Sequence, residues 1–99
     1  ITLFVSPMTY ATASYLLRKH GKEGMKRLLS NFRQLSQITT ADEKVVDAAL
    51  ESSFNDYEDA LQYYSALTRN VDVIVTRNKK DFTSACIPVL LPEELLAKL

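Results

Sequence analysis

The chain has 99 residues and no net charge at pH 7, with 46% hydrophobic and 24% charged residues. These values fit one small soluble domain with a single core. They exclude a membrane-spanning helix, because no apolar run approaches the roughly 18–20 residues that such a helix needs. The chain begins at Ile1 in an apolar run, so we expect native residues upstream.

Taken in chain order, the first forty residues predict a strand, two helices and a second strand. Thr2–Ser6 is an apolar, strand-like run, and Pro7 favours the start of a helix that ends near Gly21. Lys22–Arg33 carries an apolar stripe at helical spacing, and the alternating segment Gln34–Thr39 indicates a short strand.

The remaining residues predict two helices, two strands and a terminal helix. The first of these helices starts near Ala41, and the second spans Asp56–Arg69. The strands span Val71–Thr76 and Ile87–Leu90, and the terminal helix starts at Pro92. Thr40 and Glu43 form a capping-box pattern before the first of these helices. The alternation of strands and helices predicts a single α/β domain over residues 1–99. Its small, mostly parallel sheet would lie between two helical layers.

The single cysteine, Cys86, cannot form an internal disulfide, which predicts a reducing compartment and a cytoplasmic protein. Its apolar surroundings predict a buried side chain. One cysteine and one histidine cannot build a zinc site, and two glycines provide no phosphate-binding loop.

The fourth helix, Asp56–Arg69, is expected to bury one apolar stripe, and we expect its tyrosines in the core. The stripe is Tyr57, Ala60, Leu61, Tyr64 and Leu67, and the tyrosines are Tyr57, Tyr63 and Tyr64.

Charge is unevenly distributed along the chain. Residues 1–40 hold six basic side chains and one acidic one, whereas residues 41–66 hold seven acidic side chains and one basic one. Such asymmetry often marks one face for an anion and another for cations or a partner. The alternative is that two amphipathic helices simply have solvated polar faces.

Two clusters of oxygen-bearing side chains are candidates for a metal site. Asp56 and Asp59 lie three residues apart on one helix, so their carboxylates face the same way and repel unless a cation or a proton separates them. Thr76, Asn78 and Asp81 follow the apolar strand Val71–Thr76, and oxygen ligands of this kind suit Mg²⁺ or Mn²⁺. Helix capping explains both clusters equally well without any metal.

The chain resembles the PIN-domain ribonucleases, including the VapC-like toxins of bacterial toxin–antitoxin pairs. The resemblance is carried by Asp59-Ala60-Leu61 on a helix, by VIVTRNKKDF and by IPVLLPEELL, and more weakly by TLFVSPMTYATASYLLRK. It implies an αβα fold whose acidic residues gather at the carboxyl end of a parallel sheet and hold Mg²⁺ or Mn²⁺. It also implies an RNA substrate, and we expect a homodimer and an antitoxin protein as further partners.

The resemblance also implies residue roles. Asp59, Asp81 and Asn78 would be catalytic, and Asp59, Asp56 and Asp81 would hold the metal. Substrate contacts would come from Thr76, Arg77, Arg18 and Lys19.

Two departures from the family pattern stand out. The first acidic residue of the family lies on a strand that nothing here matches, because Thr2–Ser6 resembles the second strand. The second acidic residue, usually Glu, would fall near Thr12, which has no charge. The missing strand would lie in the middle of the sheet, so its loss would leave unpaired edges on Thr2–Ser6 and Val73–Thr76.

Three functions follow as hypotheses. The first is a metal-dependent endoribonuclease that cleaves RNA phosphodiester bonds with a metal-activated water. The second is a catalytically impaired module of the same fold that binds a protein partner, which Thr12 favours. A receiver-like signalling domain is the third, but it needs an acidic residue at a strand end that is not visible here. The sequence leaves open whether this chain alone is an enzyme.

Overall fold

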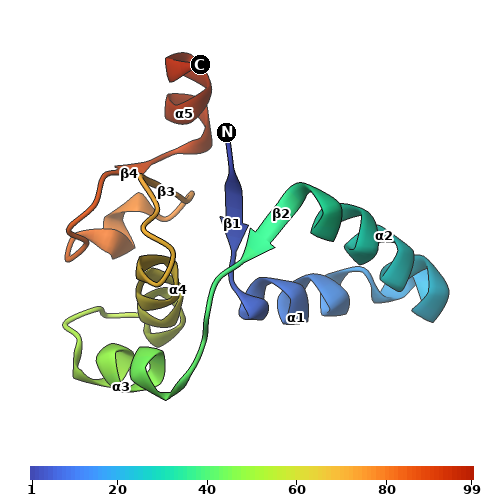
Figure 1. Cartoon of the computed structure of the whole chain (residues 1–99), viewed down its shortest axis with the longest axis horizontal. Coiled ribbons are helices and arrows are strands. Elements are labelled where there is room, and N and C mark those ends of the chain that lie inside the picture. The colour runs from blue at the N-terminus through green and yellow to red at the C-terminus, as the bar shows by residue number, and fades with distance from the viewer.

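The computed structural model describes all 99 residues and has the predicted order of elements (Figure 1). The elements are β1 (Leu3–Val5), α1 (Pro7–Leu16), α2 (Gly21–Leu35), β2 (Ser36–Ile38), α3 (Glu43–Glu51), α4 (Tyr57–Leu67), β3 (Ile74–Val75), β4 (Val89–Leu90) and α5 (Pro92–Lys98). Short 3-10 turns lie at Arg18–His20 and Lys79–Phe82. None of the helices has the length and apolar character needed to cross a bilayer.

The strands pair in parallel, which confirms the α/β class, but they form two pairs instead of one sheet. β1 pairs with β2, with Leu3 opposite Ser36, and β3 pairs with β4, with Ile74 opposite Val89. β1 and β3 are not paired with each other. Each therefore has a partner along one edge only, and the apolar segment around β3 is half-buried where a central strand was predicted.

Helix ends follow local chemistry. Pro7 is the first residue of α1, and Gly21 has a φ of 73°, which lets the chain turn between α1 and α2. The predicted capping box of Thr40 with Glu43 is wrong. Asp42 instead caps α3, with its carboxylate accepting a hydrogen bond from the amide of Val45 at 3.1 Å.

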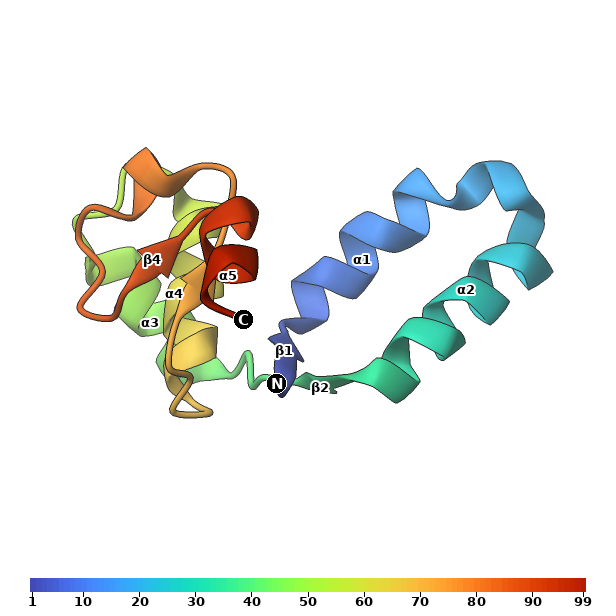
Figure 2. The ribbon, with the colours of Figure 1, turned by 90° about the horizontal axis from the view of Figure 1, so that it is seen from above.

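The helices α1 and α2 form a hairpin that projects from the rest of the molecule (Figures 1 and 2). Neither helix buries a residue. The Cα radius of gyration is 14.3 Å, which exceeds the roughly 13 Å typical of 100 residues, because the hairpin extends outward.

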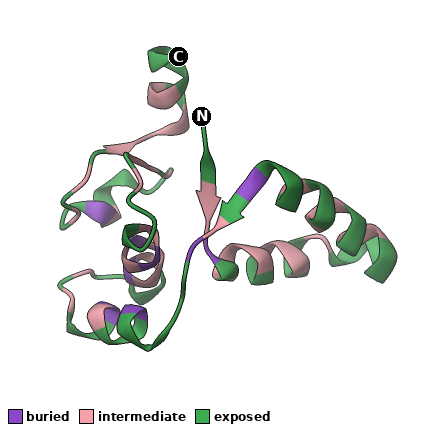
Figure 3. Ribbon diagram, viewed as in Figure 1, coloured by how far each residue is buried: buried purple, intermediate pink, exposed green.

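The apolar core lies at α3, α4 and the turn after β3 (Figure 3). Its buried residues are Val45, Ala49, Ala60, Tyr63 and Phe82. The ring of Phe54 packs against those of Tyr63 and Phe82, at centroid distances of 5.1 and 5.7 Å.

Three burial predictions are wrong. Tyr57 and Leu67 are exposed, because α4 buries Ala60, Tyr63 and Ser65, of which only Ala60 belongs to the predicted stripe. Cys86 is exposed because it lies in the loop before β4.

A buried hydroxyl cluster joins α4 to the ends of β1 and β2. Ser65, with no exposed surface, donates a hydrogen bond to the carbonyl of Thr40 at 2.6 Å and shares another with the hydroxyl of Thr39. Nearby, the hydroxyl of buried Ser6 donates to the side-chain carbonyl of Gln62 on α4. These bonds fix α4 relative to the first strand pair, because buried polar groups are costly to leave unpaired.

We expect Ser65→Ala to lower the free energy of unfolding by about 1–3 kcal/mol, because it leaves the hydroxyl of Thr39 and the carbonyl of Thr40 short of a partner. Urea denaturation measures the change. Ser14→Ala is the control, since that hydroxyl bonds only within its own helix, to Ala11, and should change stability by less than about 0.5 kcal/mol. Equal effects of the two substitutions would contradict the role of the cluster.

Candidate functional site

The first turn of α4 brings Asp56 and Asp59 together. Asp56 is the N-cap, and its carboxylate accepts a hydrogen bond from the amide of Asp59 at 3.0 Å. Helix capping therefore accounts for Asp56, as the sequence alternative allowed. One of its carboxylate oxygens is engaged in the cap, while the side chain stays exposed.

The carboxyl group of Asp59 is affected by the negative charges of three other acidic residues. Partial burial raises the pKa of its carboxyl above the ordinary 3.8, and the negative charges of Asp56, Asp81 and Glu58 raise it further. The turn after β3 thus approaches α4 closely enough for Asp81 to act on Asp59. Asp59 also has no basic partner, because the two ion pairs in the structure lie elsewhere.

The turn that follows β3 is built from its own polar groups. The hydroxyl of Thr76 accepts a hydrogen bond from the amide of Asn78 at 3.0 Å, and the carbonyl of Asn78 accepts one from the amide of Asp81 at 2.9 Å. Phe82 is buried and holds the turn against the core. The side chains of Asn78 and Asp81 are not used in these bonds, so they stay available to a ligand.

The helix α5 pairs with the basic residues of this turn. Arg77 donates to Glu93 at 2.7 Å, and Lys79 donates to Glu94 at 3.0 Å. The bonds that Glu94 accepts from the amide of Leu91 and from Lys79 lower its pKa. Such exposed pairs are weak, so a phosphate group can compete with Glu93 for Arg77.

The structure does not bring Arg18 and Lys19 to the acidic residues. Both lie in the turn between α1 and α2, at the end of the hairpin that is farthest from α4 (Figures 1 and 2). The guanidinium of Arg18 stacks on the ring of Tyr15, 3.8 Å from its centroid. Sequence spacing could not reveal this separation, because it depends on the direction in which the hairpin projects.

The oxygen-bearing side chains near Asp59 are of the kind that bind a hard divalent cation, but there are too few of them to complete a site. Carboxylate and amide oxygens without histidine or thiolate are the ligands that Mg²⁺ and Mn²⁺ prefer. No group of three or more His, Cys, Asp or Glu side chains is close enough to hold a metal ion. Thr12, at the position where the resemblance implies an acid, is exposed on α1 and adds no charge.

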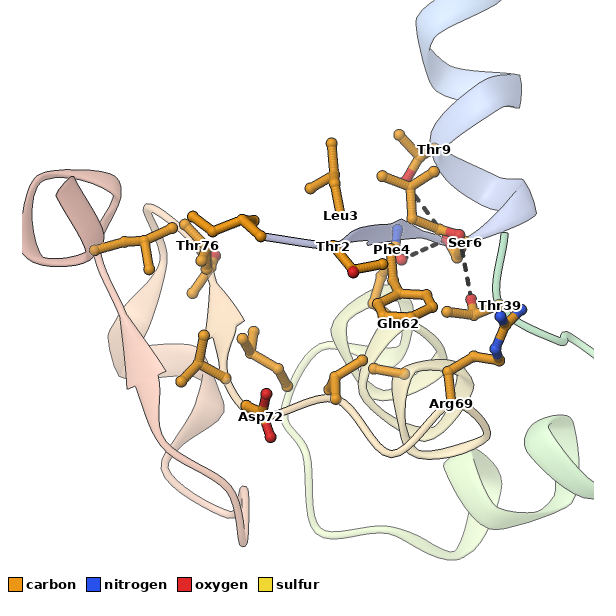
Figure 4. Close-up of a pocket in the computed structure, with 18 of the residues that line it drawn as sticks. Thr2, Leu3, Phe4, Ser6, Thr9, Thr39, Gln62, Arg69, Asp72 and Thr76 are labelled. Carbon is orange, nitrogen blue, oxygen red and sulfur yellow. Dashed lines mark hydrogen bonds between the residues drawn. The ribbon is translucent and has the colours of Figure 1, made fainter. Parts of the chain in front are cut away.

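A groove of about 970 Å³ runs along the strand edges that were expected to be unpaired, on Thr2–Ser6 and Val73–Thr76 (Figure 4). It lies between β1 and the segment 71–76, and Gln62 and Arg69 of the α4 region also line it. The sequence did not reveal that Asp59 would line this groove.

A model of the PIN-domain family matches residues 1–80 of the chain. The matched part includes Asp56, Asp59 and Asn78 and ends one residue before Asp81. No curated protein and no solved structure matches the chain.

The first prediction from this geometry separates capping from charge at Asp56. Asp56→Ala should lower the free energy of unfolding by about 1 kcal/mol, because it removes the cap of α4. Asp56→Asn keeps a capping oxygen and should stay within about 0.5 kcal/mol of the wild type. Thermal and urea unfolding measure both. A loss in Asp56→Asn as large as that in Asp56→Ala would show that charge, and not capping, matters there.

The second prediction concerns the raised pKa of Asp59. The folded state binds this proton more tightly than the unfolded state, so Asp59 costs stability as pH rises above its ordinary pKa of 3.8. Asp59→Asn should therefore be more stable than the wild type at pH 7, by up to about 1 kcal/mol. The difference should vanish below about pH 3.5.

Unfolding measured across this pH range tests the prediction. Asp47→Asn, at an exposed position of α3, is the control and should change stability little at any pH. A destabilised Asp59→Asn at pH 7 would contradict the electrostatic account.

Proposed function

Because the chain belongs to the PIN-domain family, which makes it a nuclease domain, we propose that it acts as a Mg²⁺- or Mn²⁺-dependent endoribonuclease. The single observation that carries this proposal is Asp59. Partial burial raises the pKa of its carboxyl, and the negative charges of Asp56 and Asp81, the other two residues that the resemblance assigns to a metal, raise it further. A carboxylate that is repelled by neighbouring negative charges is stabilised when a cation binds beside it.

Each residue has a role in the proposed reaction. When bound, a divalent ion lowers the pKa of a coordinated water and offsets the charge that develops on the phosphate. Asp59 would hold the ion, Asp56 and Asp81 would bind its waters, and Asn78 would orient them. Arg77 would bind an RNA phosphate after releasing Glu93, and Thr76 would contact the substrate beside it.

The proposed site needs at least one more carboxylate than this chain assembles. In the family pattern this carboxylate lies on a strand that precedes the segment matching β1. We propose that such a strand completes the centre. Without it, we expect the affinity for the ion to be low, since two or three loosely grouped carboxylates leave most of its ligands to water.

The biological setting is also part of the proposal. A toxin-like ribonuclease of the VapC type would act on RNA in the cytoplasm and would be held inactive by an antitoxin protein. The exposed, unpaired thiol of Cys86 suits a reducing compartment. A homodimer would cover apolar side chains of the α1–α2 hairpin, such as Leu35, which is 76% exposed.

The second candidate is a non-catalytic PIN module that binds a protein partner. The observation that favours it is the lack of any group of three metal-binding side chains, together with Thr12 in place of an acid. Calorimetry decides between the two candidates. Absence of Mn²⁺ binding, with a stable protein partner in pull-down, would favour the second.

The direct test is cleavage of single-stranded RNA in the presence of Mn²⁺. When the strand that completes the centre is present, we expect cleavage that EDTA abolishes and that Asp59→Asn reduces by about 10–100-fold, the range for loss of a group that supports a metal. Glu51→Gln is the control, because Glu51 is an exposed acidic residue at the end of α3, and it should cleave like the wild type. Unchanged cleavage by Asp59→Asn would reject the proposed site.

A further inference from the structure

The α1–α2 hairpin carries positive charge that the fold does not use. We call its basic side chains the basic arm, and they are Arg18, Lys19, Lys22, Lys26, Arg27 and Arg33. All six are exposed, and Glu23 is the only acidic residue among residues 1–40. Both ion pairs of the structure join α5 to the turn after β3. No carboxylate is therefore paired with the arm.

The preferences of an isolated helix do not account for the basic residues of α2. Lys22 lies in the first turn, where the positive end of the helix dipole disfavours a cation. Lys26 follows four residues later and Arg33 seven residues after that, so all three lie along one face of α2. Like charges at such spacings repel one another. A polyanion bound along this face would offset both penalties.

Arg18, at the tip of the hairpin, is held in position by Tyr15. Its guanidinium donates a hydrogen bond to the carbonyl of Tyr15 at 2.7 Å and stacks on the ring, 3.8 Å from the centroid. This bond uses one of the five N–H donors of the guanidinium. A side chain that is already fixed loses less conformational freedom when its remaining donors bind a phosphate.

The basic arm points away from the acidic half of the chain, which includes α3 and the start of α4 (Figures 1 and 2). α2 has 15 residues, so it is about 22 Å long. A single phosphate group cannot contact charges spread over this length, whereas a chain of phosphates can. At about 3.4 Å per nucleotide of a stacked strand, the length corresponds to about six nucleotides.

We propose that the basic arm binds the phosphate backbone of RNA at a place separate from the acidic residues. Contacts to phosphates carry no sequence information, so the arm holds the RNA without selecting its bases. The choice of RNA as the polyanion rests on the proposed function. The arm adds a requirement on the substrate, which must exceed about six nucleotides to extend from the tip of the hairpin to the region of Asp59.

Binding of RNA in EDTA tests the arm without any cleavage. The probe is a fluorescein-labelled oligouridylate of about 20 nucleotides, which is long enough to cover α2. Lys22→Gln/Lys26→Gln should weaken its binding at least about fivefold at low salt. The same variant should reduce the slope of log K against log salt by about 1.4, because each phosphate contact of a single strand contributes about 0.7.

Two further double variants are the controls. Lys44→Gln/Lys98→Gln removes two exposed lysines outside the hairpin, gives the same net charge and should bind the RNA like the wild type. Lys22→Arg/Lys26→Arg keeps the positive charges and should retain binding. Circular dichroism verifies the fold of all three variants, and we expect it unchanged because neither α1 nor α2 buries a residue.

Cleavage kinetics, measured with the strand that completes the centre present, separate this proposal from the nuclease activity. Lys22→Gln/Lys26→Gln should raise KM for the long RNA at least about fivefold and leave kcat within about twofold, because the arm does not touch the reacting atoms. An RNA of about four nucleotides is too short to reach both places, so its KM should be the same for variant and wild type. Absence of cleavage by the wild type would reject the nuclease activity, and the binding in EDTA would still decide the role of the arm.

Three results would overturn the role of the arm. An equal loss of RNA binding in Lys22→Gln/Lys26→Gln and Lys44→Gln/Lys98→Gln would show diffuse attraction to net charge. An unchanged salt slope in Lys22→Gln/Lys26→Gln would show that these lysines contact no phosphate. If this variant bound RNA normally but lost binding to vesicles containing phosphatidylserine, the arm would belong to a membrane surface instead.

Discussion

The position of α4 depends on the buried hydroxyl of Ser65. This group bonds to Thr39 and Thr40 at the end of β2, and Thr39 in turn bonds through its backbone to Val5 of β1. One buried side chain thus fixes the helix relative to the first strand pair, and the bond between Ser6 and Gln62 fixes it one turn nearer its start. Asp59 lies one turn before Gln62, so these contacts place its carboxylate at the groove.

The negative charges of the acidic residues near Asp59 lower the stability of the folded state but favour the binding of a cation. Asp56 stabilises α4 as its cap, but its charge raises the pKa of Asp59 together with Asp81. An uncompensated group of acids costs free energy in the folded state, and a cation that binds there recovers it.

Local structure could be predicted from the sequence where local chemistry decides it. Pro7 starts α1 and Pro92 starts α5, as predicted. Long-range structure could not be predicted. Periodicity gives α4 an apolar stripe but does not determine that Tyr63 is buried while Tyr57 is exposed. The separation of Arg18 from Asp59 depends on how the α1–α2 hairpin projects. The unpaired edges of β1 and β3, by contrast, were expected from the family resemblance.

The central proposal is that Asp59 holds a hard divalent cation whose waters bind Asp56 and Asp81, and paramagnetic broadening by Mn²⁺ tests it most directly. At substoichiometric Mn²⁺, the amide resonances of Asp56, Asp59, Asn78 and Asp81 should broaden first, because a bound paramagnetic ion acts most strongly on its nearest nuclei. The acidic helix α3 should be affected only at higher concentrations. Equal broadening of α3 and of the Asp59 region would show diffuse attraction of cations to acidic residues and would contradict the account.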